Sequence, residues 1–287
     1  MSEKSDHEIL QRASDWWSTS IIDIHPGEIA IRGYQIQDLI GKVRFPDMVW
    51  LMLRGDLPTQ GQSELLEAAM VPGVDHGPQA PSICIARMAV TCGLPVNGAM
   101  ASAVNVLDDI HGGAGQRCME IYYEIDAEAG AKGDLVQAAT VVLARNGKII
   151  PGFGHRFHPI DPRVEPLYAL LEKAMSDGTI AGRYSSIGRA VATALNEGRK
   201  RPIPMNIDGI TAVIFCELGF EPELGRGIFA LSRSVGILAH AWEQKQQGGR
   251  IKGPMPKEIP YTYTGPARRT VPSDRNRMNQ LAPQPQG

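Results

Sequence analysis

The sequence has 287 residues, of which 43% are hydrophobic, and its formal net charge at pH 7 is −2. This length and composition allow one large domain or two modest domains with a hydrophobic core. The near-neutral charge argues against nucleic acid or an anionic membrane as the main partner, and no apolar run approaches the roughly 20 residues that cross a bilayer. The four cysteines are scattered and the first ten residues are polar, so we expect a cytoplasmic protein with free thiols.

The spacing of apolar residues predicts a largely helical chain. One short β-ribbon is expected near the N-terminus, at residues 28–34 (EIAIRGY). Helices are expected where apolar or small residues recur every three or four positions, at residues 98–110, 116–125, 164–175, 185–197 and 228–247. Residues 267–287 are polar and rich in proline, which predicts a mobile tail or an arm that lies on a partner subunit.

Two histidines in the first half of the chain lie beside glycines. His76 occupies the loop DHGPQAPS, where a solvated or structural histidine is the commoner outcome. His111 lies between the helix expected at 98–110 and the glycines of HGGAG, which open the next helix. A helix N-terminus disfavours positive charge, so a neutral His111 could donate a hydrogen bond to a developing enolate oxygen. A histidine that merely ends a helix beside a glycine turn is an equally good interpretation.

The segment PGFGHRFHPIDPR, residues 151–163, combines turn-forming residues with ionisable side chains. Gly152 and Gly154 allow the backbone to approach a ligand closely. His155 can bind or release a proton near neutral pH, and Arg163 offers a planar fork that suits a carboxylate or phosphate. The segment is therefore either a rigid surface loop or a loop that holds an anion beside an acid–base group.

Further candidates lie in the second half of the chain. Asp208, in NIDG, precedes an apolar helix and is either a functional carboxylate or the N-cap of that helix. In the helix expected at 228–247, Arg233 and His240 share a face for which exposure to solvent is the usual outcome. A different face carries an apolar stripe that we expect to be buried, made of Ile228, Leu231, Val235, Leu238 and Trp242.

Other kinds of site find little support in the sequence. His155 and His158 are close together, but no HExxH motif or acidic ligand set accompanies them, so we expect no metal site. A serine hydrolase is disfavoured because there is no GxSxG motif. A nucleotide-binding P-loop or dinucleotide loop is equally disfavoured, because HGGAGQ lacks the strand that should precede it.

Taken together and in order, these segments resemble the citrate synthase family, and within it the compact citryl-CoA lyase-like members. The resemblance spans about residues 16 to 265 and rests on IRGYQIQDLIGK, FPDMVWLMLRGDLPT, DHG, HGGAG, GFGHRFHPIDPR, NIDG and FALSRSVGILAHAWEQ. It implies an all-α, two-domain helical fold. A large discontinuous domain would comprise residues 1–112 and 218–287, and residues 113–217 would form a small domain that carries CoA-binding and catalytic residues. The resemblance also implies a homodimer or a higher homo-oligomer.

The resemblance further implies three catalytic residues. His111 would hydrogen-bond the thioester oxygen of acetyl-CoA as it enolises, which is where a hydrogen-bond donor stabilises the transition state most. Asp208 would move the proton at the acetyl methyl group, and His155 would protonate the carbonyl oxygen of oxaloacetate.

Binding roles follow from the same resemblance. Arg163 and Arg233 would bind substrate carboxylates, and His76 would contact oxaloacetate. The backbone of residues 152–154 would lie against the adenine of coenzyme A; these residues are Gly152, Phe153 and Gly154. A coenzyme A thioester is thus the expected substrate, with no metal or prosthetic group.

Some positions depart from the pattern of the synthases. Gly115 and Gln116 stand where synthases usually have Asn and Glu, and Gly253 stands where they carry an arginine that reaches into the partner's site. The sequence leaves open whether Arg250 or Lys252 replaces that arginine. These departures favour a lyase-like enzyme that cleaves or forms citryl-CoA. The alternatives are a citrate or 2-methylcitrate synthase and a CoA-ester-binding protein without turnover.

Overall fold

A computed structural model describes residues 3–131, 133–147, 149–154 and 159–271. The chain divides into two compact units, Met1–Lys252 and Gly253–Gly287. Within the described residues, every helix and strand belongs to the first unit.

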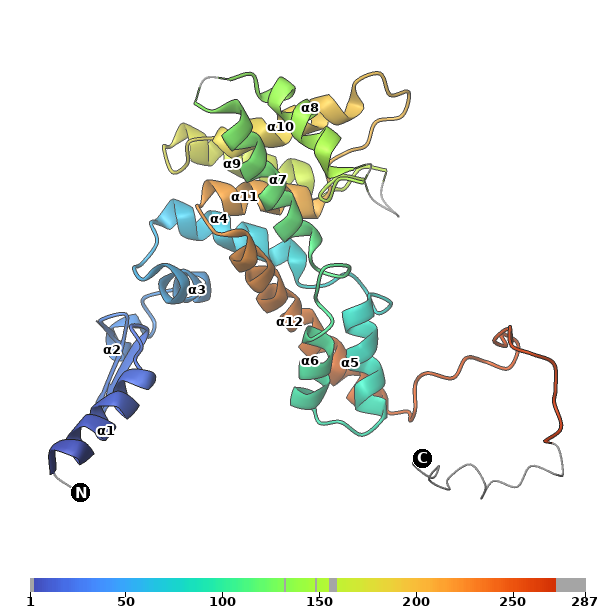
Figure 1. Cartoon of the computed structure of the whole chain (residues 1–287), viewed down its shortest axis with the longest axis horizontal. Helices are drawn as coiled ribbons and strands as arrows, with labels where there is room; N and C mark the ends of the chain where they lie inside the picture. The colour runs from blue at the N-terminus through green and yellow to red at the C-terminus, as the bar shows by residue number, and fades with distance from the viewer. Residues whose placement is uncertain (1–2, 132, 148, 155–158, 272–287) are drawn as a thin grey trace, which may run out of the picture. The chain divides into compact units, whose positions relative to one another are not determined.

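The first unit is mainly helical, which confirms the predicted all-α class. Its helices, labelled in Figure 1, are α1 (Glu3–Trp16), α2 (Ile36–Leu39), α3 (Phe45–Arg54), α4 (Gln60–Met70), α5 (Pro81–Thr91), α6 (Val96–Val104), α7 (Ala114–Ala129), α8 (Leu135–Asn146), α9 (Val164–Ser176), α10 (Arg183–Asn196), α11 (Ile207–Glu217) and α12 (Pro222–Gln247). A 3-10 turn, η1 (Val71–Gly73), follows α4. In the part of the chain that the structure describes, no helix is long and apolar enough to cross a bilayer.

The predicted β-ribbon is confirmed. Strands β1 (Ile22–His25), β2 (Glu28–Ile31) and β3 (Tyr34–Gln35) form an antiparallel sheet in the order β1-β2-β3. A two-residue turn joins β2 to β3, and both of its residues have positive φ angles, 49° at Arg32 and 86° at Gly33. Such a turn matches the twist of the two strands that it connects.

Most of the predicted helices are confirmed, but one ends early. The helix expected to reach Ile110 stops at Val104, and the chain beyond it is bound by α12. Arg226 of α12 binds Asp108 through Nη1 at 2.6 Å and Asp109 through Nη2 at 2.5 Å. These ion pairs tie the segment that leads to His111 onto α12.

Two hydrophobic clusters form the core of the first unit. The larger cluster draws on α3, α4 and α7–α11, together with Ile228 at the start of α12. The smaller cluster lies where α5 and α6 pack along α12 (Figure 1), and consists of Ile83, Ala86, Ala99, Ala103, Leu107, Ile237 and Ala241. Helix α12 therefore contributes to both clusters. The division into domains of residues 1–112 with 218–287 and of residues 113–217 stays a prediction.

Within a single chain, the predicted burial of the α12 stripe is wrong for four of its five residues. Ile228 is 2% exposed, but the other four side chains are between 40% and 59% exposed. The helix instead buries a face of small residues such as Gly236, because its neighbours come very close: a Cβ on Gly236 would lie 2.1 Å from the Val74 carbonyl oxygen. The exposed apolar residues form a surface that we name the α12 ridge: Leu231, Val235, Leu238 and Trp242.

Candidate functional site

A cavity of about 630 Å³ collects five of the predicted site residues. The loop after η1, the segment before α7, and the first turn of α11 all contribute to its wall, together with α12. The five residues are His76, His111, Arg163, Asp208 and Arg233. Among the described lining residues, Asp208 is the only carboxylate. A volume of this size and this balance of charge suit an anionic organic ligand together with acid–base chemistry.

The His111 imidazole is held by the first turn of α5. The backbone N–H of Ser82 donates to Nε2 at 3.1 Å, and Ser82 Oγ lies 2.9 Å from the same nitrogen. Because Nε2 accepts a hydrogen bond from an amide, the proton of the neutral ring belongs on Nδ1. Burial lowers the pKa of His111, and electrostatic interaction with Arg233 and His76 lowers it further. A neutral ring in this position can donate only through Nδ1, and the helix whose first turn holds the side chain is α5.

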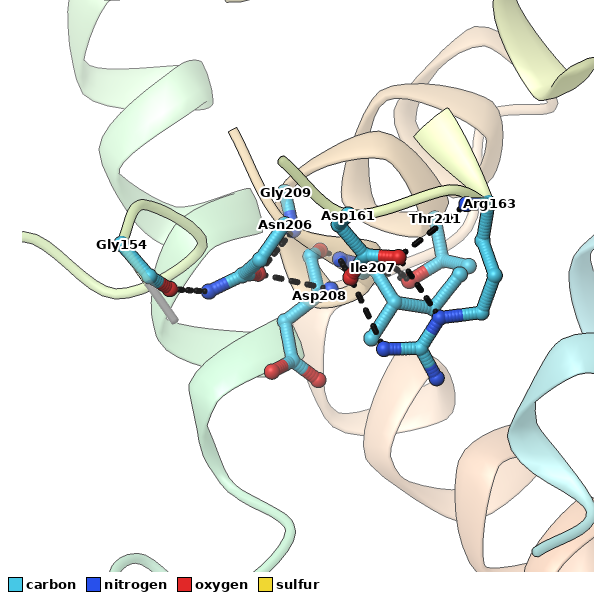
Figure 2. A network of polar contacts seen from close by, with 8 residues as sticks. All are labelled: Gly154, Asp161, Arg163, Asn206, Ile207, Asp208, Gly209 and Thr211. Atoms are coloured by element: carbon cyan, nitrogen blue, oxygen red, sulfur yellow. Dashed lines mark hydrogen bonds and ion pairs between the residues drawn. The ribbon is translucent and has the colours of Figure 1, made fainter. Parts of the chain in front are cut away.

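Asp208 lies in the first turn of α11, but it does not cap that helix. The side chain of Asn206 is the cap: its Oδ1 accepts hydrogen bonds from the backbone N–H groups of Asp208 at 2.9 Å and Gly209 at 3.3 Å. The interpretation of Asp208 as an N-cap is therefore wrong. Figure 2 shows the Asp208 carboxylate pointing away from the Asn206 side chain, and this residue lines the cavity.

Arg163 is held by a buried neighbour, Asp161, which is 1% exposed. Arg163 Nε donates to Asp161 Oδ1 and Arg163 Nη2 donates to Asp161 Oδ2, both at 2.8 Å (Figure 2). Burial alone would raise the pKa of Asp161, but the hydrogen bonds and the charge of Arg163, together with the hydrogen bond from Ile207 N–H, lower that pKa to about 2. Asp161 is a residue that sequence reasoning missed, although its position two residues before Arg163 is typical of a local side-chain-to-backbone turn.

Arg233 is buried, contrary to the solvent-exposed face expected for it, with 5% of its surface exposed. Its Nε donates to the Gly73 carbonyl at 2.9 Å, and its guanidinium lies over the Phe229 ring, 5.1 Å from the centroid. Burial lowers the pKa of Arg233, whereas the carboxylates of Asp75 and Asp208 act in the opposite direction. A guanidinium desolvated in a cavity wall is a strong site for a carboxylate.

His240 also makes contacts within the fold instead of facing only solvent. Its Nδ1 lies 3.0 Å from Nη1 of the buried Arg87 of α5. Since an arginine can only donate, Nδ1 accepts, and the Nε2 proton of the neutral ring faces Asp75 Oδ1 at 3.3 Å. Asp75 precedes His76 and also accepts a hydrogen bond from Gly77 N–H at 3.2 Å. The loop that carries His76 is thus connected to α5 and α12 by a chain of polar contacts.

The segment predicted to lie against adenine makes internal contacts. Gly152 has φ of 84°, and a Cβ there would lie 2.7 Å from Gly209 Cα, so close packing on the start of α11 requires a glycine. Phe153 is buried, and Gly154 N–H donates to the Pro204 carbonyl at 2.7 Å. These residues are not among those that line the cavity. Their contact with a nucleotide stays a prediction.

His155 and His158 lie outside the described residues, so the catalytic role of His155 also stays a prediction. Among the residues that are described, no cluster of three or more His, Cys, Asp or Glu side chains could hold a metal ion.

Comparisons with known proteins agree on one family. A family model for the C-terminal domain of citrate synthase matches residues 11–72 and 62–254. The citrate synthase of Acidithiobacillus ferridurans is 29% identical over 229 residues, which are 77% of this chain and 55% of that protein. The citrate synthase of Haloferax volcanii is 30% identical over 70% of this chain and 52% of that protein. The chain therefore spans about half the length of these relatives.

Solved structures extend the comparison. The citryl-CoA lyase of Hydrogenobacter thermophilus superposes with a TM-score of 0.80 at 30% identity, over 89% of this chain and 97% of that one. A citrate synthase from Thermoplasma acidophilum, solved with carboxymethyl coenzyme A and oxaloacetate, has a TM-score of 0.64 at 22% identity, over 80% of this chain and 59% of that one. The second likeness concerns the fold alone. The family model and the similarity in sequence and structure establish that the chain belongs to the citrate synthase family.

Proposed function

We propose that this protein cleaves citryl-CoA to acetyl-CoA and oxaloacetate, or forms citryl-CoA from them. The observation that carries the proposal is the cavity, which brings a neutral imidazole donor and a carboxylate together with two arginines. The similar protein from Hydrogenobacter thermophilus, matched over 97% of its length, is a citryl-CoA lyase, which supports cleavage as the preferred direction.

In this proposal, cleavage begins when His155 takes the proton of the substrate hydroxyl group. The carbon–carbon bond then breaks, giving oxaloacetate and leaving the electron pair on the acetyl thioester as an enolate. The Nδ1–H of His111 donates to the enolate oxygen, a contact that typically lowers the barrier by about 3–4 kcal/mol. Asp208, protonated at the start, returns a proton to the methylene carbon and completes acetyl-CoA. Condensation is the same path reversed.

The proposed binding roles follow from charge and position. Arg163 and Arg233 would hold the carboxylates of the oxo-acid part, and His76 would contact the same part from the opposite loop. The thioester arm would occupy the less polar remainder of the cavity. The backbone of Gly152, Phe153 and Gly154 would lie against adenine, as the family resemblance suggests. A Thermoplasma relative of the same fold binds a coenzyme A derivative and oxaloacetate together, which supports a coenzyme A thioester as the substrate.

A citrate or 2-methylcitrate synthase is the second candidate. The relatives from Acidithiobacillus ferridurans and Haloferax volcanii are both citrate synthases, which favours it. The two activities differ in one step, because a synthase also hydrolyses the thioester and releases free coenzyme A. A cytoplasmic location and a homodimer or higher homo-oligomer belong to the same proposal, and the exposed α12 ridge supports self-association.

The test is to incubate the purified protein with citryl-CoA and follow the products by NMR, beside an Asp208→Asn variant. We expect acetyl-CoA and oxaloacetate, with the rate reduced 10²–10⁴-fold in the variant, as for loss of a general acid–base group. A Glu223→Gln variant is the matched control, since Glu223 is a carboxylate in the first turn of α12 that does not line the cavity. Citrate and free coenzyme A would instead indicate a synthase. Binding of citryl-CoA without turnover would indicate a CoA-ester-binding protein.

A further inference from the structure

We propose that Asp161 is a positioning residue that fixes Arg163 and the start of α11 to one another, so that Arg163 and Asp208 face the same ligand. This inference rests on the proposed function, because it assumes that both residues act on one substrate. It adds to that function a residue that neither the family comparisons nor the cavity lining indicate.

The first observation is the way in which Asp161 binds the guanidinium. The carboxylate uses the Nε and Nη2 edge, with both contacts at 2.8 Å, and also accepts the backbone N–H of Arg163 at 3.1 Å. A two-point contact of this kind fixes the plane of the guanidinium as well as its position. Among the described residues, no hydrogen bond engages Nη1 of Arg163, and the residue lines the cavity. The opposite edge of the fork is therefore left for a ligand.

The second observation is that the same carboxylate reaches the helix that carries Asp208. Asp161 Oδ2 accepts the backbone N–H of Ile207 at 3.0 Å, besides Nη2 of Arg163 (Figure 2). Ile207 is the first residue of α11 and directly precedes Asp208. Its amide is one of the helix N-terminal donors that have no partner within the helix. The buried carboxylate of Asp161 thus connects Arg163 to the start of α11, and the proposed function requires both to act on one substrate.

The chemistry of the side chain explains why an aspartate stands here. Its two oxygens accept four hydrogen bonds, two from Arg163 side-chain nitrogens and two from backbone N–H groups, which fills the capacity of a carboxylate. Asparagine accepts through one oxygen only, and its NH₂ group would face donors. Asp161→Asn therefore removes the hydrogen bonds that one of the two carboxylate oxygens accepts, while the volume of the side chain stays nearly unchanged.

The experiment measures oxaloacetate binding by calorimetry and citryl-CoA turnover for Asp161→Asn, Arg163→Gln and the double variant. We expect Asp161→Asn to weaken oxaloacetate binding at least 10-fold. We also expect the double variant to bind no more weakly than Arg163→Gln, because both changes act through the same guanidinium. Asp126→Asn is the matched control, since it breaks an aspartate–arginine pair of similar length, 2.7 Å to Arg183, outside the cavity lining. That control should bind oxaloacetate as the wild type does.

A second variant tests the helix contact and guards against loss of folding in Asp161→Asn. Ile207→Pro replaces the N–H that Asp161 binds with a ring methylene group and also removes the Ile side chain. The helix itself should persist, because proline is well tolerated at the first position of a helix. Compared with Ile207→Ala, which corrects for the lost side chain, it should lower kcat at least 5-fold and change oxaloacetate binding less than 2-fold. Unchanged binding in Asp161→Asn, or losses that multiply in the double variant, would overturn the inference alone. A wild-type protein that neither binds oxaloacetate nor cleaves citryl-CoA would overturn the proposed function.

Discussion

Ser82 determines which ring nitrogen of His111 carries the proton. The Ser82 N–H occupies Nε2, so the ring can present only Nδ1–H to a ligand while it is neutral. Its surroundings disfavour a second proton, because burial and the nearby Arg233 lower the pKa of the imidazole. A histidine in this state polarises a carbonyl group without first having to lose a proton.

This state of His111 predicts a pH dependence. The pKa of His111 lies below the ordinary value of 6.5 in the folded protein, so the unfolded chain binds the proton first as the pH falls. The free energy of unfolding should therefore decrease as the pH falls from about 6.5 toward the folded pKa. Above pH 6.5, this group should not change the free energy of unfolding. The check is urea unfolding at a series of pH values for the wild type and His111→Asn, whose difference should show this slope.

Ring-nitrogen NMR of the wild type provides an independent measurement of the same group. The spectrum should show the proton of neutral His111 on Nδ1 and a titration midpoint below 6.5, with the signal identified by its loss in His111→Asn. A midpoint above 6.5, or a proton on Nε2, would contradict the assignment. The acid limb of kcat/KM should then also lie below pH 6.5, since the neutral ring is the working form.

At the scale of elements, the start of α11 is connected to the segment that ends at Gly154 by one side chain, that of Asn206. Asn206 caps this helix with its Oδ1, while its Nδ2 donates to the Gly154 carbonyl at 2.6 Å. The same side chain therefore connects the helix that carries Asp208 to the segment that precedes His155. An aspartate would cap the helix equally well but has no N–H to donate to Gly154.

We expect Asn206→Ala to lower the free energy of unfolding by about 2 kcal/mol, of which the lost cap and the lost hydrogen bond each account for about half. Thr59→Ala is the matched control, because Thr59 caps α4 through Gln62 N–H alone and should cost about 1 kcal/mol. Asn206→Asp should keep the cap and lose the bond to Gly154. Urea unfolding of the three variants measures these costs, and equal losses in Asn206→Ala and Thr59→Ala would show that the link to Gly154 adds no stability.

At the scale of the whole molecule, the sequence predicted the helical class better than it predicted which helix faces are buried. Spacing alone located α9 closely, because this helix buries an ordinary apolar stripe. It failed for α12, where close approach of the neighbouring helices selects small residues such as Gly236. Periodicity does not contain that information, since it depends on which helices pack together.

For the site, the order of motifs along the sequence was informative, whereas contacts between distant residues were not predictable. The sequence order of the motifs identified Arg163 and Asp208, and the fold places both in the cavity wall. Pairings between distant segments left no signal: Ser82 and His111 are 29 positions apart, and neither position suggests the other. The pairing of Asp161 with Arg163 could have been predicted, because both lie in the same motif. The contact of Asp161 with Ile207 could be found only from the structure.

The α12 ridge leads to a prediction for the whole molecule. Single exposed leucines are ordinary on protein surfaces, but four large apolar side chains along one face of a helix are typical of an interface. We expect the ridge to be buried against a second copy of the chain in the predicted homo-oligomer. Leu238→Glu should then dissociate the oligomer, because burial of an unpaired carboxylate costs on the order of several kcal/mol.

Light scattering coupled to size-exclusion chromatography gives the mass of each variant directly. Leu170→Glu is the matched control: Leu170 of α9 is 42% exposed and Leu238 is 44% exposed, but Leu170 is not part of the ridge. The wild type and Leu170→Glu should elute with the mass of a dimer or larger, and Leu238→Glu with that of a monomer. A monomeric wild type would show that the ridge is not an interface between copies. An oligomer that survives Leu238→Glu would assign the interface to another surface, since a charge at the centre of a buried apolar ridge has no partner there.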